Sequence, residues 1–248
     1  MSNGADVLQS ESVLLPEPTI LCEDGPLLAV YKPAGLLTQG VPDGAVRTVE
    51  AWAKDYLKQK YAKPGNVYLG IPHRLDRPVS GVMVFAKNSK AAARLAEQFR
   101  ERTVQKEYLC ITEGVPSPTA DRLTDWLLKD ADKAHVSVAE PESPGARTAE
   151  LSYEVLQIAD TRALVRIQLH TGRMHQIRVQ LSSRGWPVVG DHQYGAPCRF
   201  PGIDDGDRPH PTVIALHAAR LELSHPIRYD RLMLTAPMPA TWAQFGFA

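Results

Sequence analysis

The sequence predicts an α+β fold with a central mixed, mostly antiparallel sheet flanked by helices. The expected strands outnumber the expected helices. Most of these strands also follow one another directly along the chain, an order that favours antiparallel pairing over a doubly wound parallel sheet. The 248 residues are 44% hydrophobic and 23% charged, a composition typical of a globular protein with a sizeable core.

Short apolar or alternating segments between Gly, Pro or charged residues indicate the strands. By this criterion, strands are expected at residues 27–32, 82–86, 106–112, 148–158, 163–169, 213–217, 220–224 and 231–235. Residues 115–147 are rich in proline and charge, which indicates a loop-rich excursion or a hairpin. A further loop is expected over residues 197–211.

Capping residues mark the start of two expected helices. Residues 48–60 begin with Thr48, and residues 88–102 begin with an Asn-Ser pair, both of which suit the N-cap position. A third helix is expected over residues 174–183, ended by Gly185, and a short one near Trp242. The polar, irregular residues 1–18 are expected to be a flexible tail, and residues 19–248 a single domain.

Charge and cysteine content exclude several classes of protein. The 28 basic and 28 acidic residues cancel, so the overall charge does not indicate a polyanionic partner. Between residues 60 and 110, however, ten Lys and Arg stand against four Asp and Glu, which fits either a phosphate-rich ligand or a solvated helix face. Three distant cysteines, with no signal peptide and no long apolar run, indicate a reduced, cytoplasmic protein that does not enter membranes.

The most informative segment is His-Arg-Leu-Asp-Arg-Pro-Val-Ser-Gly at residues 73–81, which leads directly into an expected buried strand. A charged loop at the end of a buried strand is a common position for chemistry. Asp76 lies among three potential cations, His73, Arg74 and Arg77, which predicts an ionised carboxylate with a low pKa. Such a carboxylate suits a nucleophilic or electrostatic role. A surface salt-bridge cluster is the alternative interpretation.

An arginine interrupts the apolar stripe of the third helix. The stripe consists of Met174, Ile177 and Leu181. Arg178 occupies the remaining position of the stripe, where an apolar residue would be expected. A buried guanidinium requires a carboxylate partner, and Asp76 is the partner that we expect. Alternatively, the head group of Arg178 reaches the surface at the edge of the helix.

Two further segments carry residues suited to a flat, phosphorylated ligand. At residues 170–173, His-Thr-Gly-Arg precedes the third helix, and its glycine lets the backbone N–H groups face outward toward an anion. Tyr108 shares a strand face with Lys106 and Cys110. It is either a packing residue or an aromatic platform whose phenol can exchange a proton.

Together these segments resemble the RluA-type pseudouridine synthases. The motifs are Lys-Pro-Ala-Gly at 32–35, His-Arg-Leu-Asp at 73–76, Ser-Gly at 80–81, Gln-Lys-Glu-Tyr at 105–108, Thr-Gly-Arg-Met-His-Gln-Ile-Arg at 171–178, Gly-Asp at 190–191 and Leu-His-Ala at 216–218. The resemblance covers most of residues 20–240. It implies the pseudouridine synthase catalytic fold with a central cleft, and an isomerase that converts uridines of ribosomal or transfer RNA without a cofactor or a metal.

The resemblance also implies roles for individual residues. The family's nucleophilic aspartate corresponds to Asp76, its ring-stacking tyrosine and proposed base to Tyr108, and its salt-bridging basic residue to Arg178. The residues expected to bind substrate are Arg74, which would help to flip the target base, together with His73, Leu216, Arg173 and Lys106. Val79 departs from the threonine of many members, which puts the hydrogen bonding of this loop in doubt.

Several alternatives stay open. Asp76 would attack C1′, remove a proton from C2′ or attack C6 of the base. The segment before residue 27 is expected to be too short for the N-terminal S4-type RNA-binding domain of some relatives, so we expect the catalytic domain itself to recognise RNA. We also expect a monomer. A non-catalytic RNA-binding or RNA-folding protein on the same scaffold is the rival interpretation. A hydrolase would need a paired acid or a metal site beside Asp76.

Overall fold

The computed structural model describes residues 16–40, 47–203 and 210–247, so most of the expected tail lies outside the described residues. The strands are β1 (Thr19–Asp24), β2 (Leu27–Lys32), β3 (Ser80–Ala86), β4 (Gln105–Glu113), β5 (Ala120–Lys129), β6 (Val136–Ala139), β7 (Arg147–Ala159), β8 (Arg162–Leu169), β9 (Leu216–Ser224) and β10 (Arg231–Thr235). The helices are α1 (Val49–Lys60), α2 (Ser89–Arg100), α3 (Gln176–Ser182) and the 3-10 helices η1 (His192–Tyr194) and η2 (Ala240–Phe245).

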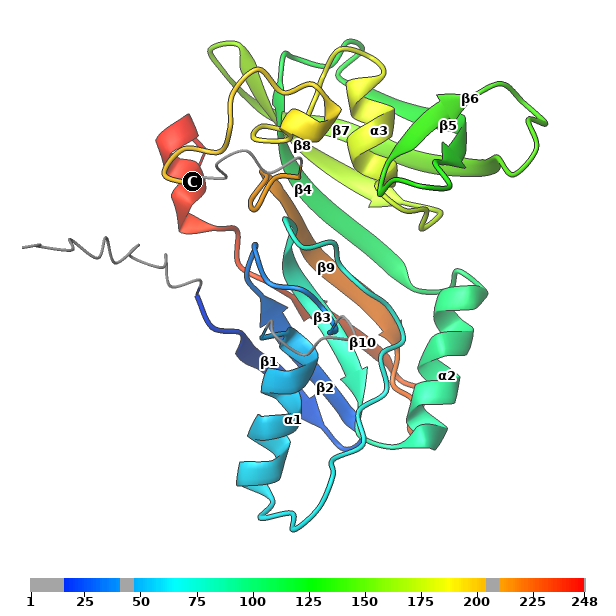
Figure 1. Ribbon diagram of the computed structural model, residues 1–248, viewed down its shortest axis with the longest axis vertical. Coiled ribbons are helices and arrows are strands. Elements are labelled where there is room, and N and C mark those ends of the chain that lie inside the picture. Colours follow the sequence, from blue (N-terminus) through cyan, green and yellow to red (C-terminus); the bar gives the residue numbers. More distant parts are fainter. Residues whose placement is uncertain (1–15, 41–46, 204–209, 248) are drawn as a thin grey trace, which may run out of the picture.

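All these strands belong to one mixed sheet in the order β1-β2-β3-β9-β4-β8-β7-β5-β6, with β10 paired to β9. Every pairing is antiparallel except that of β3 with β9. Figure 1 shows two halves, one holding β1, β2 and β3 beside α1 and α2, the other holding β5, β6 and β7 beside α3. The predicted mixed, mostly antiparallel α+β fold is therefore confirmed.

The predicted caps and most predicted strands agree with the structure. The Thr48 side chain accepts the N–H of Ala51, and the Asn88 side chain accepts that of Ala91. The excursion after β4 is the β5–β6 hairpin. The two strands expected at 213–217 and 220–224 form one strand, β9, because its central residues also pair with β4, but this strand begins only at Leu216 and residues 213–215 precede it.

Two elements differ from the prediction. β1 was not expected, because this edge strand is mostly only partly buried and its sequence lacks a clear alternation of apolar and polar residues. The third helix was expected from residue 174 but begins at Gln176. The chain enters it through His175, which has the left-handed φ of 52° and so cannot continue a helix backwards.

The two halves of the sheet meet at a close backbone approach between β3 and β9. Ser80 lies opposite His217, and Gly81 lies opposite Ala218. A Cβ on Gly81 would lie only 2.3 Å from the carbonyl oxygen of Ala218, and the φ of Gly81 is +126°. Only glycine tolerates both conditions. The Ser80 hydroxyl and His217 Nδ1, 2.9 Å apart, add a buried side-chain hydrogen bond at the same point.

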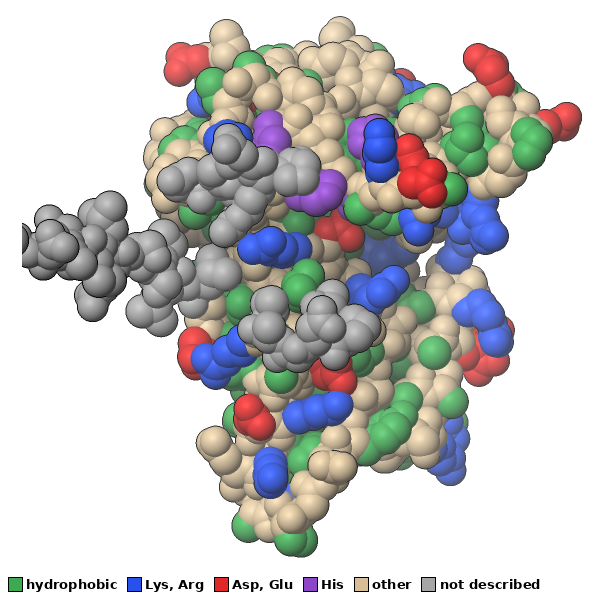
Figure 2. Space-filling model, in the orientation of Figure 1, with side chains coloured by type: hydrophobic (Ala, Val, Ile, Leu, Met, Phe, Trp, Pro, Cys, Tyr) green, Lys and Arg blue, Asp and Glu red, His purple; other side chains and the backbone are tan. Residues whose placement is uncertain are grey.

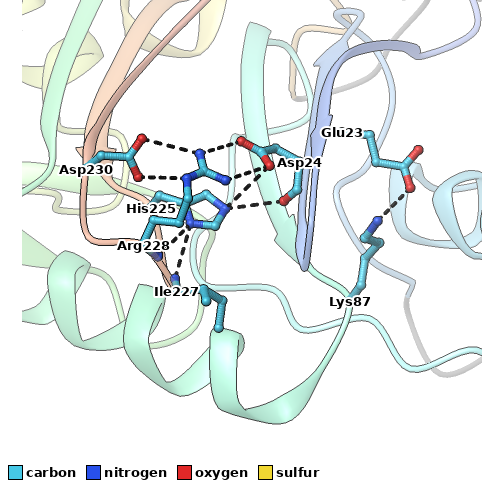
Figure 3. A network of polar contacts seen from close by, with 7 residues as sticks. All are labelled: Glu23, Asp24, Lys87, His225, Ile227, Arg228 and Asp230. Carbon is cyan, nitrogen blue, oxygen red and sulfur yellow. Dashed lines mark hydrogen bonds and ion pairs between the residues drawn. The ribbon is translucent and has the colours of Figure 1, made fainter.

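A polar network joins the turn between β1 and β2 to the turn between β9 and β10 (Figure 3). Asp24 lies at the end of β1, and Arg228 in the turn between β9 and β10 donates to its two carboxylate oxygens at 2.9 and 2.8 Å. Buried His225 accepts two backbone N–H groups of that turn at Nδ1, while its Nε2 lies 3.4 Å from the carbonyl oxygen of Asp24. The β1–β2 turn is therefore tied to the β9–β10 turn, and β1 and β10 are in contact.

Replacing Gly81 by alanine should destabilise the fold by about 3 kcal/mol or more, because the new methyl group meets the backbone of β9 in a strained conformation. Denaturant unfolding would measure this change. Gly65→Ala is the matched control, since nothing lies within 4 Å of a Cβ at Gly65. It should change stability by less than about 1 kcal/mol. Equal, small effects of the two variants would contradict this account of the β3–β9 approach.

Candidate active site

A cleft of about 740 Å³ lies between the two halves of the sheet. All eight residues that the sequence singled out line it, namely His73, Arg74, Asp76, Lys106, Tyr108, Arg173, Arg178 and Leu216. They come from the loop before β3, from β4, from the segment leading into α3 and α3 itself, and from the start of β9. Figure 2 shows Lys and Arg side chains on both sides of the hollow in the middle of the molecule.

The loop that carries Asp76 is held from below by Lys32, at the end of β2. The Lys32 side chain is fully buried, and its Nζ donates to the carbonyl oxygens of Pro33 at 3.1 Å, Arg77 at 3.1 Å and Val79 at 2.7 Å. Burial lowers the pKa of Lys32 to about 7, although the charge of Asp76 acts in the opposite direction. The Lys32 side chain therefore fixes the backbone that follows Asp76, and its positive charge acts on the Asp76 carboxylate.

Two further backbone contacts complete this support. Gly35 and Arg77 are joined by an N–H···O bond of 2.8 Å, and Thr38 Oγ1 donates to the carbonyl oxygen of Leu75 at 2.8 Å. These contacts answer the doubt raised by Val79. The loop is hydrogen-bonded through Lys32, Gly35 and Thr38, and the Val79 side chain is buried against the core. Lys32 and Thr38 had no predicted role. A charged residue closing a fully apolar strand was the available signal for Lys32.

Asp76 differs from its expected state. Its side chain is 39% exposed at the cleft, but the surrounding protein displaces much of its water, and this burial raises its pKa. The positive charges of Arg178, Lys32 and Arg74 lower it only in part. The prediction of a low pKa for Asp76 was wrong. The sequence of the loop shows which charges lie near Asp76, but not how strongly the cleft wall removes water from its carboxylate.

His73 is not one of the cations around Asp76. Its Nε2 accepts the backbone N–H of Val84 in β3 at 3.0 Å, and its ring stacks on Phe99 with centroids 4.5 Å apart. Burial, together with the charge of Lys106, lowers the pKa of His73 to about 3. The neutral His73 ring thus accepts an N–H of β3 that the carbonyl of a neighbouring strand would otherwise accept.

Arg178 is buried and does not reach the surface, which decides between the two alternatives, but its hydrogen-bonded partner is not Asp76. Its Nε and Nη2 donate to the two carboxylate oxygens of Asp191 at 2.6 and 2.8 Å, and Nη2 also donates to Gln193. Asp191 has no exposed surface. The predicted Asp76–Arg178 pair is therefore corrected: Asp191 holds the guanidinium in place, and the charge of Arg178 acts on Asp76 across the cleft.

Tyr108 and Leu216 form the flat, apolar part of the cleft wall. They come from the neighbouring strands β4 and β9, and Leu216 is buried. Burial and the nearby charge of Asp76 raise the pKa of Tyr108, so its phenol stays protonated. An aromatic ring beside a leucine suits the two faces of a planar ligand.

Positive charge is concentrated on one side of the cleft, in a group of basic residues that we call the basic bank. Arg102, Lys106 and Arg173 line the cleft. Burial is the largest cause that lowers the pKa of Arg173, and the charges of Arg102 and Arg147 lower it further. Burial and Arg102 lower the pKa of Lys106 to about 8. Among the residues that the structure describes, no carboxylate forms an ion pair with any of these four. Cations held close together without carboxylates favour a polyanion.

The expected anion site at the start of the third helix is not formed as predicted. The backbone N–H of Arg173 donates to Oε1 of Gln176 at 3.0 Å, and the buried Gln176 amide bonds back to Glu150. The backbone N–H of Arg173 is therefore already bonded to the Gln176 side chain and does not face outward toward an anion. Positive charge in this region therefore comes from the side chains of Lys106 and Arg173.

Neither a metal-binding cluster nor a membrane-spanning helix is found in the described ranges. Within residues 16–40, 47–203 and 210–247, no group of three or more His, Cys, Asp and Glu side chains converges on a position suited to a metal ion. No helix in the same ranges has the length and apolar character needed to cross a membrane.

Comparison with known proteins gives consistent similarities. A family model described as RNA pseudouridylate synthase matches residues 26–183. The chain is 32% identical to ribosomal large subunit pseudouridine synthase D of Xanthomonas campestris, covering 94% of this chain and 70% of that protein. It is 33% identical to tRNA pseudouridine synthase C of Pasteurella multocida, covering 90% and 92%. The solved structure of human RNA pseudouridylate synthase domain containing 4 superposes with a TM-score of 0.74 at 27% identity, covering 92% of both chains.

The buried Arg178–Asp191 pair generates a stability prediction. Arg178→Met leaves the Asp191 carboxylate buried without its partner and should cost about 3–5 kcal/mol of unfolding free energy. The double variant Arg178→Met/Asp191→Leu removes both charges and should recover much of that loss. Urea unfolding of the two single variants and the double variant measures the coupling. Additive losses would mean that the two side chains do not depend on each other.

Proposed function

Because the chain belongs to the RNA pseudouridylate synthase family, we propose that it converts specific uridines of ribosomal or transfer RNA to pseudouridine, with Asp76 as the reacting carboxylate. Membership confirms the resemblance to RluA-type enzymes and makes the chain an isomerase that acts on RNA. The observation that carries the proposed site is the convergence of Asp76, Tyr108 and Arg178 on one cleft from three separate segments.

The chemistry fits the groups in the cleft. The N1–C1′ bond of uridine breaks, the base rotates, and C5 bonds to C1′; C5 then loses a proton while N1 gains one, so the composition is unchanged. Asp76 supplies the carboxylate that attacks the sugar or the base, or removes the C2′ proton. A carboxylate whose pKa is raised by burial is a better nucleophile and base than one in water. Arg178 and Lys32 keep part of its negative charge compensated.

Tyr108 supports the base in this scheme. Its protonated ring lines the cleft beside Leu216, so a uracil can lie between an aromatic and an aliphatic surface. Stacking of a base on an aromatic side chain contributes about 1–3 kcal/mol. This offsets part of the cost of extruding the uridine from a paired stem. Arg74, which is exposed on the Asp76 loop, is placed to occupy the space that the flipped base leaves.

The basic bank supplies contacts to the RNA backbone. The charge of Arg102 lowers the pKa of Lys106, and the charges of Arg102 and Arg147 lower the pKa of Arg173, so a phosphate between these side chains would relieve repulsion. Recognition of the RNA then rests on the cleft of the catalytic domain. Because these contacts go to phosphates, they give affinity and position, and sequence choice depends on the pocket for the flipped base.

Asp76→Asn should abolish pseudouridine formation, by about 10³-fold or more, because the amide is neither nucleophile nor base. Pseudouridine mapping of total RNA from cells lacking this gene, complemented with the wild type or the variant, identifies the target and tests the residue. Asp55→Asn, on the exposed side of α1, is the control and should restore the modification. RNA binding by Asp76→Asn should persist. Modification rescued by Asp76→Asn would overturn the assignment, and binding without modification by the wild type would favour an RNA-binding protein on this scaffold.

Salt dependence tests the basic bank. Arg102→Gln and Arg173→Gln should each weaken binding to the target RNA and reduce the slope of log affinity against log salt by about 0.7–0.9 for each phosphate that is no longer neutralised. Lys54→Gln is the matched control, because Lys54 on α1 is paired with Glu50 at 2.6 Å and does not line the cleft. Filter binding between low and moderate salt gives the slopes. Unchanged slopes in both arginine variants would place the RNA backbone elsewhere.

A further inference from the structure

His175 stands between Asp76 and Tyr194, in the segment that enters α3. Its ring lines the cleft, and its Nε2 lies 3.8 Å from Oδ2 of Asp76. Its Nδ1 lies 2.7 Å from the hydroxyl oxygen of Tyr194. One nitrogen of the imidazole therefore lies within hydrogen-bond distance of a buried hydroxyl, and the other faces the carboxylate that is proposed to react.

The hydrogen bonds of Tyr194 favour one of the two positions of the proton on the His175 ring. The Tyr194 hydroxyl oxygen accepts the backbone N–H of Val136 at 3.0 Å, so its own proton points away from β6. His175 Nδ1, 2.7 Å away, is available to accept that proton, and this assignment makes Nδ1 the acceptor. A ring nitrogen that accepts has no proton in the neutral imidazole, so the proton resides on the other nitrogen. The Nε2–H then faces Asp76.

The ring acts as a neutral donor and not as a cation. Burial and the charge of Arg178 lower the pKa of His175 to about 3, against the opposing effect of Asp191. The guanidinium of Arg178 lies over the Tyr194 ring, 4.7 Å from its centroid, so the same tyrosine is held from a second side.

We propose that His175 is a positioning residue for Asp76, whose Nε2–H orients the carboxylate, and that the Tyr194 hydroxyl fixes the tautomer that makes this possible. The proposal rests on the function proposed above for Asp76. At 3.8 Å the contact is longer than a hydrogen bond, and it is expected to shorten when substrate fills the cleft.

Backbone strain at His175 supports a role for its side chain. Its φ is 52°, in the left-handed region that glycine and asparagine occupy most easily. Residues held in such conformations are concentrated at functional sites, where the surrounding structure maintains them. This conformation places the imidazole in the cleft wall, one residue before the helix.

The acid limb of the pH profile depends on every charged or titratable group that faces Asp76. These are Arg178 and His175 from the α3 region, Lys32 from β2, Arg74 from the loop, Tyr108 from β4 and Tyr194 from η1. An N–H donor stabilises the ionised carboxylate, so loss of the His175 donor raises the pKa of Asp76. The acid limb of kcat/KM should then move to higher pH.

A matched pair of variants separates the donor from the backbone. His175→Asn suits the left-handed conformation but is too short to reach Asp76, whereas His175→Gln places an N–H near the Nε2 position. His175→Asn should lower kcat by about 10-fold or more, with KM nearly unchanged and the acid limb shifted upward. His175→Gln should recover much of the loss. Tyr194→Phe should resemble His175→Asn in a milder form, since its ring still packs under Arg178.

A spectroscopic measurement on the wild-type protein tests the tautomer independently of activity. The ¹⁵N resonances of the His175 ring should show a protonated Nε2 and an unprotonated Nδ1, and Tyr194→Phe should mix the two tautomers. A protonated Nδ1 in the wild type would overturn the proposal. So would a folded His175→Asn variant with wild-type kcat and pH profile. If the wild type makes no pseudouridine, the proposed function fails, whereas normal activity with unaffected His175 variants removes only this inference.

Discussion

The buried ammonium of Lys32 is the interaction on which the site depends. It donates to three backbone carbonyl oxygens, that of the adjacent Pro33 and those of Arg77 and Val79 just after Asp76, and so joins the Asp76 loop to the end of β2. A lysine can do this because one Nζ carries three donors, whereas an apolar residue would remove the Lys32 donor from the Pro33 and Val79 carbonyls and leave Arg77 only the N–H of Gly35. The position of Asp76 is thus set by the backbone of a buried strand.

The same lysine also belongs to the balance of charge in the cleft. Burial favours the neutral forms of both Lys32 and Asp76, and each charge partly stabilises the other. Arg178 contributes a third charge, but its direct bonds go to Asp191. Its position is therefore independent of Asp76, so its field remains in place whether Asp76 is free, protonated or bonded to a substrate.

Sequence reasoning identified the wall of the cleft but not the bonds within it. Spacing placed Arg178 in an apolar stripe but left open whether its head group is buried or reaches the surface, whereas the motifs were sufficient to bring Asp76 and Tyr108 into one site. The partner of Arg178 depends on the path of the chain around η1, which no local pattern encodes. The pKa of Asp76 and the neutral state of His73 depend on burial by distant segments, so nearby charges alone predicted the wrong direction. β1 was missed because an edge strand needs little apolar periodicity.

The parallel pairing of β3 with β9 has a consequence for how the protein acquires its site. The Ser80–His217 contact joins residues 137 positions apart. Contacts of such long sequence separation form late, because the chain between them must first be ordered. During synthesis, β9 follows β3 by more than a hundred residues, since Ser80 and His217 are 137 positions apart. The part of the cleft wall that Leu216 contributes therefore forms only after the loop that carries Asp76 has been made, and a nascent chain that ends before β9 lacks the complete cleft.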